Sequence, residues 1–176
     1  RDETRAAIVK PLSTLPVRLH TPPDLIEKAV DLSGGYPYLI QFFGRELVEQ
    51  LLANGGTLSA ERFPDPEAIH RLDTGLFSAR WNRTTDRQRE LLILIATRPR
   101  RGTRDFSVRE LEQLRSDQLP AETLNVHQLV AGLCERGLLY RTRHGHYAFT
   151  VPMSEEMILR RLRTDQQVDD SWQMPE

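Results

Sequence analysis

The sequence lacks most of the features that point directly to a cellular compartment or to a chemistry. Its 176 residues include one cysteine, Cys134, which can neither form a disulfide within the chain nor complete a zinc site by itself. The longest purely apolar run, residues 91–96, is far shorter than the roughly 20 residues that a transmembrane helix needs. No basic segment followed by an apolar one opens the chain, so nothing indicates export. We therefore expect a cytoplasmic protein that does not interact with a membrane.

An excess of charge of either sign is absent too. The chain has 24 Lys and Arg against 25 Asp and Glu, which excludes a strongly basic scavenger of nucleic acids. Residues 1–83 hold 10 basic and 11 acidic side chains, whereas residues 84–164 hold 14 basic and 10 acidic ones. Since 22 of the 24 basic residues are Arg, an arginine-rich surface is not by itself evidence of a binding site. The first residue is Arg1 rather than Met, so we expect a piece of a longer protein.

Helix signals dominate the first half of the chain. Apolar residues recur at helical spacing, and Pro and Gly mark where the helices begin and end. The pattern predicts helices over residues 2–12, between Pro22-Pro23 and Gly34-Gly35, over residues 37–53 and over residues 66–81. In the third of these helices, the predicted apolar face is Ile40, Phe43, Leu47 and Leu51, and the predicted polar stripe is Gln41, Arg45 and Glu49.

From Thr84 onward, the pattern predicts three helices, a two-stranded hairpin and a last helix. Thr84 or Thr85 can cap the first helix, Ser107 with Glu110 forms a capping box before the second, and the third begins near Pro120. Residues 138–142 and 146–151 alternate like strands around a turn, and the last helix is predicted over residues 153–163. The two His of the hairpin lack a third ligand at suitable spacing, so no metal site is predicted. Three helices followed by a hairpin is the pattern of a winged helix.

Four segments carry a resemblance to a known family. Ser33-Gly34-Gly35-Tyr36-Pro37-Tyr38-Leu39-Ile40-Gln41 resembles the Gly-x-Pro segment in the helical lid of AAA+/STAND-type P-loop ATPases. Residues 5–12 resemble the segment that enters this lid. Residues 77–92 and 135–139 resemble the winged helix of archaeal and bacterial members, including relatives of the Orc1/Cdc6 initiators. The resemblance extends over residues 1–163, and in this class a winged helix often follows the lid.

The resemblance implies a fold, a cofactor and a set of site residues. The expected fold is mainly α, with a helical lid bundle over residues 1–83, a winged helix-turn-helix domain with a small β-hairpin over residues 84–164, and a disordered tail over residues 165–176. The full-length parent would bind ATP or ADP, with Gly35, Tyr36 and Pro37 beside the base and Arg45 in the phosphate-sensing role. Its upstream nucleotide-binding domain would be the first partner of this fragment. The chain itself has no Gly-x-x-x-x-Gly-Lys-[Ser/Thr] motif, so we expect no ATP hydrolysis by the fragment.

The predicted recognition helix bears on the choice between a protein and a DNA partner. On a helical wheel, residues 121–137 direct outward a face without basic side chains, namely Ala121, Leu124, Gln128, Ala131, Gly132 and Glu135. Such a face is poorly suited to bases and phosphates, so we expect a regulatory fragment that couples the nucleotide state to a protein partner. One alternative is a DNA-binding winged-helix module of an initiator- or regulator-like ATPase, with contacts from Arg100, Arg101, Arg141 and Arg143. A freestanding adaptor with no link to nucleotides is a third hypothesis.

Overall fold

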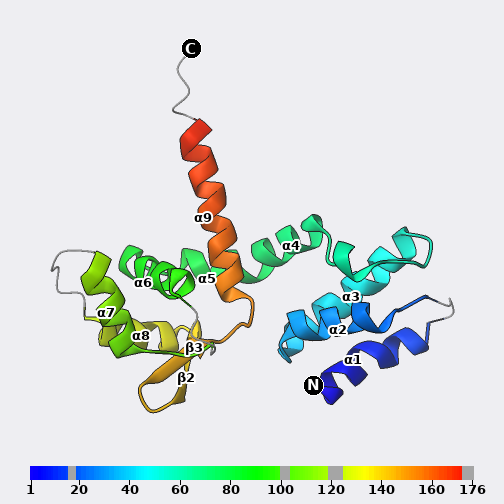
Figure 1. Ribbon diagram of the computed structural model, residues 1–176, viewed down its shortest axis with the longest axis horizontal. Coiled ribbons are helices and arrows are strands. Elements are labelled where there is room, and N and C mark those ends of the chain that lie inside the picture. Colours follow the sequence, from blue (N-terminus) through cyan, green and yellow to red (C-terminus); the bar gives the residue numbers. More distant parts are fainter. Residues whose placement is uncertain (16–18, 100–103, 119–124, 172–176) are drawn as a thin grey trace. The chain divides into compact units, whose positions relative to one another are not determined.

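The computed structural model describes residues 1–15, 19–99, 104–118 and 125–171 (Figure 1). Helices make up most of these residues, and a small three-stranded antiparallel sheet completes the secondary structure, which confirms the predicted mainly helical class. Nowhere in these ranges is a helix both long enough and apolar enough to cross a membrane. The chain divides into two compact units, residues 1–74 and 75–176, a division that falls earlier than the expected boundary at Arg83.

The first unit is a small helical bundle. It contains α1 (Asp2–Ser13), α2 (Pro23–Ser33), α3 (Pro37–Ala53), the 3₁₀ turn η1 (Ala60–Arg62) and α4 (Pro66–Leu72). Proline begins α2, α3 and α4, because its fixed φ suits a helix start and its missing N–H costs no helical hydrogen bond there. Helices α1, α2 and α3 pack against one another in pairs (Figure 1).

Helix α3 supplies much of the core of this unit. Its residues Leu39, Phe43, Leu47 and Leu51 recur every four positions and are fully buried. Burying one such side chain contributes roughly 1.5–3 kcal/mol, so this stripe is a main source of stability. The predicted face is confirmed at Phe43, Leu47 and Leu51, whereas Ile40 is only half-buried because the buried face extends over Leu39 instead. The predicted polar stripe of α3 is exposed.

The second unit combines helices with the sheet. The chain leaves α4 through a π-helical turn η2 (Asp73–Ser78), which spans the division between the units, and then α5 (Ala79–Asn82). The rest is ordered α6 (Asp86–Thr97), β1 (Phe106–Ser107), α7 (Val108–Gln118), α8 (Val126–Glu135), β2 (Leu139–Arg143), β3 (His146–Phe149) and α9 (Ser154–Ser171). The spatial order of the strands is β1-β3-β2, and both pairings are antiparallel.

Most of the predicted local signals in this unit are confirmed. Thr85 caps α6 in a reciprocal capping box with Gln88, and Ser107 Oγ accepts a hydrogen bond of 3.1 Å from the Glu110 N–H. Gly145 turns the hairpin with a φ of +71°, which glycine adopts without steric cost. Strand β1 was not predicted, because two residues are too few to show an alternating pattern.

The end of the chain departs from the expectation. Helix α9 continues through Ser171, beyond the predicted end of the last helix at residue 163, whereas disorder of the tail from residue 165 stays a prediction. The polar composition suggested disorder, but no Gly or Pro interrupts residues 154–171 and a helix that is already nucleated can extend through them. Residues 172–176 lie outside the described ranges.

Candidate functional site

A groove between α1 and α3 is a concave feature of the first unit. Its volume is about 520 Å³, within the range of small-molecule sites. Helix α1 contributes apolar side chains, and α3 contributes both apolar and polar ones. The lining residues are Ala7, Ile8, Pro11 and Leu12 from α1, and Pro37, Ile40, Gln41, Gly44, Arg45 and Val48 from α3.

The four residues expected at a nucleotide do not all meet in this groove. Pro37 and Arg45 line it, whereas Gly35 and Tyr36 are not among its lining residues. Gly34 and Gly35 have φ values of +53° and +76°, so a left-handed turn between α2 and α3 requires glycine here for a purely conformational reason. Tyr36 is half-buried at the start of α3, where its carbonyl accepts a hydrogen bond of 2.9 Å from the Ile40 N–H.

Arg45 carries a positive charge that is only loosely compensated. Its side chain is 63% exposed, and its guanidinium lies 3.7 Å from Glu46 Oε1 and 3.5 Å from Glu49 Oε1. Both separations exceed the 2.7–3.2 Å of a normal N–H···O hydrogen bond. The guanidinium is therefore available to an anion that enters the groove, without first breaking a strong ion pair.

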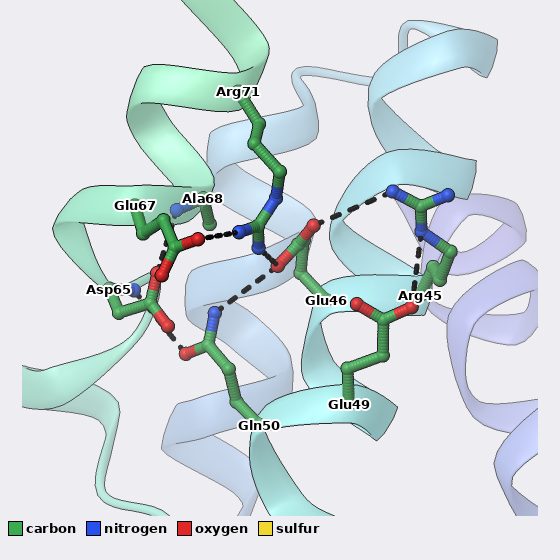
Figure 2. Close-up of polar contacts among 8 residues, drawn as sticks. All are labelled: Arg45, Glu46, Glu49, Gln50, Asp65, Glu67, Ala68 and Arg71. Carbon is green, nitrogen blue, oxygen red and sulfur yellow. Dashed lines mark hydrogen bonds and ion pairs between the residues drawn. The ribbon is translucent and has the colours of Figure 1, made fainter. Parts of the chain in front are cut away.

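Glu46 is the feature of this unit that the sequence pattern did not reveal. Its carboxylate is fully buried and accepts a hydrogen bond of 2.7 Å from Arg71, on α4 (Figure 2). This contact raises the pKa of Arg71 above its ordinary value. Gln50 donates to the same carboxylate over 3.4 Å and accepts from the Asp65 N–H over 3.3 Å. Glu46 lies at helical spacing from Phe42 and Phe43, which was the available signal that a charge would be buried here.

The hairpin of the second unit presents the arginines considered for nucleic acid. Arg141 and Arg143 are exposed, and the Arg141 guanidinium donates over 2.7 Å to His144 Nδ1. Arg143 lies 3.3 Å from Asp105, whose carboxylate also lies 3.6 Å from His146 Nδ1. Arg100 and Arg101, the other two residues of this hypothesis, lie outside the described residues.

Arg98, a further arginine of the loop after α6, is not a surface residue. Its side chain is 2% exposed and donates over 2.7 Å to Glu155 of α9, which is 8% exposed. The same guanidinium donates to the carbonyls of Ile95 and Arg104 and lies over the ring of Phe106 at 5.1 Å. Arg98 thus links α6, the loop and α9. None of its guanidinium N–H groups is directed to solvent, where it could bind a phosphate.

The outer face of α8 is weakly charged, as the helical wheel predicted. His127, Gln128, Ala131 and Glu135 are exposed, and no Arg or Lys lies between Val126 and Glu135. His127 Nε2 lies 3.9 Å from Glu112 of α7, so the imidazole faces a carboxylate rather than open solvent alone. Ala121 and Leu124 of the predicted face lie outside the described residues.

Comparison with known proteins gives a match for one part of the chain. Residues 74–158 match a family described as a domain of unknown function (DUF8462). The match begins one residue before the second unit and ends within α9. No curated protein and no solved structure matches the chain.

Proposed function

We propose that this chain is the lid and winged-helix region of an AAA+/STAND-type P-loop ATPase, which passes the nucleotide state of an upstream domain to a protein partner. The observation that carries the proposal is the groove of the first unit. One helix, α3, brings Pro37 at its start and the loosely paired Arg45 to the same side, together with Gln41. A lid that senses a nucleotide needs a rigid helix start together with a guanidinium that is not held in a close ion pair.

The groove fits one edge of a nucleotide and leaves the rest to another domain. Apolar walls from α1 and α3 suit a base, and Arg45 suits one phosphate. The lining residues include no Lys, and the described residues contain no group of three or more His, Cys, Asp or Glu that could hold a metal ion. When bound, the nucleotide supplies the phosphoanhydride chemistry, whereas this chain binds, orients and excludes water. In this proposal, the fragment therefore closes over a site that it does not form alone.

The order of elements in the second unit supports a winged helix. A helix, a short strand, two helices and a hairpin follow one another as α6, β1, α7, α8, β2 and β3, and β1 pairs with β3 beside β2. In such a module α8 is the helix that would enter a DNA groove. Its outer face offers neither the Arg and Lys that bind phosphates nor the donors that read guanine, so a protein partner is favoured.

The coding sequence upstream of Arg1 provides the first test, since we expect it to encode a P-loop. In the full-length protein, Arg45→Ala should weaken ATP binding about 10-fold or more in isothermal titration, because a charge-assisted hydrogen bond contributes about 1.5–3 kcal/mol. The matched control is Arg62→Ala, an exposed arginine of the same unit that is not part of the groove. Micromolar ATP affinity of the 176-residue chain alone, or an upstream sequence without a P-loop, would contradict the proposal.

A DNA-binding hairpin is the second candidate, favoured by the exposure of Arg141 and Arg143. It predicts salt-dependent binding of duplex DNA in fluorescence anisotropy at about 50 mM salt, weakened by Ala at either arginine. The proposed protein-contact function predicts no saturable binding under the same conditions.

A further inference from the structure

Gly44 lies inside α3, where the backbone does not require glycine. The helix runs without interruption from Pro37 to Ala53, and Gly44 is not one of the glycines with a positive φ. Inside a helix, glycine is less favourable than alanine because it loses more backbone freedom on folding, which lowers the equilibrium constant of folding about 4-fold. An isolated glycine in such a place therefore indicates a packing role or a functional one.

Packing within the chain does not account for Gly44. A Cβ placed on this residue meets no heavy atom of the described residues within 4 Å, so alanine would fit without displacing a neighbour. Gly132 of α8 is different, because a Cβ there would lie 3.1 Å from Gln88 Nε2 and would crowd that side chain. The fold thus leaves open the space that a side chain of residue 44 would fill.

This open space belongs to the groove between α1 and α3, and polar residues of the groove lie close to it. Gln41 comes three residues before Gly44 and Arg45 directly after it, and both side chains are exposed. The guanidinium of Arg45 lies 3.7 and 3.5 Å from its two carboxylate neighbours, so it is not held in a close ion pair. Pro37 and Arg45 are about 12 Å apart along the helix axis. A ligand that contacts both therefore extends along the groove past Gly44.

We propose that Gly44 is a ligand-binding residue of the groove, and that the sugar–phosphate part of a nucleotide lies directly against the α3 backbone at this residue. Glycine permits a ligand to approach the backbone closely, whereas a Cβ would occupy the space that the ligand needs. A phosphate at this point is also beside Arg45, whose guanidinium can bind it. The inference rests on the proposed function and adds the point at which the backbone of α3 contacts the nucleotide.

The experiment compares stability with affinity in the full-length protein. Gly44→Ala should slow amide hydrogen exchange about 4-fold in the peptides that cover α3, measured by mass spectrometry without nucleotide, because alanine stabilises the helix. The same variant should weaken ATP binding about 5-fold or more in isothermal titration, and Gly44→Leu about 50-fold or more, because the added atoms occupy the ligand's space. Ala53→Leu is the matched control, since this exposed residue of α3 does not line the groove, and its ATP affinity should stay within about 2-fold of the parent.

The outcomes separate this inference from the proposed function. If both Gly44 variants bind ATP as the parent does while Arg45→Ala binds more weakly, the inference is overturned and the proposed function is kept. If Gly44→Ala binds ATP weakly but speeds exchange in α3, the glycine has a structural role and the inference is again overturned. A parent protein that does not bind ATP would refute the proposed function and the inference together. Gly44→Ser replaces Gly44→Leu if the leucine variant does not fold, as judged by circular dichroism.

Discussion

Removing either partner of the Arg98–Glu155 pair should unfold the second unit far more readily than an ordinary surface change. Both side chains are almost completely buried, and their contact of 2.7 Å is accompanied by bonds from Arg98 to two carbonyls. Arg98→Met removes the buried cation that the carboxylate contacts, and Glu155→Ala removes the buried anion that the guanidinium contacts. Breaking a buried pair in this way costs about 3–5 kcal/mol. For a unit of about 100 residues, the lower value lowers the melting temperature by about 12 °C or more.

The assay is urea unfolding followed by tryptophan fluorescence. Trp81 is buried in the second unit, near Phe77 and the guanidinium groups of Arg89 and Arg161, so its emission reports on this unit. Replacing Trp172 by Phe in all variants removes the other tryptophan.

A double variant separates the burial of charge from the loss of packing. Arg98→Met combined with Glu155→Leu replaces both charges by apolar groups, and we expect it to regain most of the lost stability. Glu135→Gln, an exposed change in the same unit, should stay within about 0.5 kcal/mol of the parent. If both single variants lost less than about 1 kcal/mol of unfolding free energy, the pair would be hydrated and the argument would be refuted.

Three further predictions concern a cap, a carboxylate and a thiol. Thr85→Ala removes the capping box with Gln88 and should lower the free energy of unfolding of the second unit by about 1 kcal/mol, measured in urea; no change would mean that the cap is replaced by water. The hydrogen bond from Arg1 holds the pKa of Glu27 below its ordinary value, so its stabilisation is present at neutral pH and is lost as the pH falls through the lowered pKa. Glu27→Gln should therefore destabilise the chain in urea less at about pH 3 than at about pH 7, and an equal effect at both would contradict this sign. Burial raises the pKa of the Cys134 thiol, so its reaction with a disulfide reagent at about pH 8 should be at least about 10-fold slower in the native chain than in urea, and equal rates would show that the thiol is accessible.

Local signals in the sequence predicted most of the helices and the hairpin. Helix starts at proline, the Thr85 cap and the glycine turn of the hairpin depend on residues close together in the chain, so they can be read from the sequence. The apolar face of α3 was also predicted, apart from a rotation toward Leu39.

The missed features depend on contacts between distant residues. Arg98 was grouped with other loop arginines, because nothing near it in the sequence shows that Glu155 lies beside it. The spacing of Glu46 from Phe42 and Phe43 indicated burial, but its partner could not be predicted because Arg71 comes from another helix. For the candidate site, the sequence pattern grouped Gly35 and Tyr36 with Pro37 and Arg45, but it could not show that only Pro37 and Arg45 line the groove.

The buried carboxylate of Glu46 also fixes how far α4 can slide along α3. Helices packed only through aliphatic side chains can shift by one turn and exchange one set of contacts for a similar one. Here, a shift by one turn would move Arg71 away from Glu46 and the Asp65 N–H away from Gln50. Several polar groups would then lose their hydrogen-bond partners at once. The bundle can therefore move as a rigid body more easily than it can change its internal register.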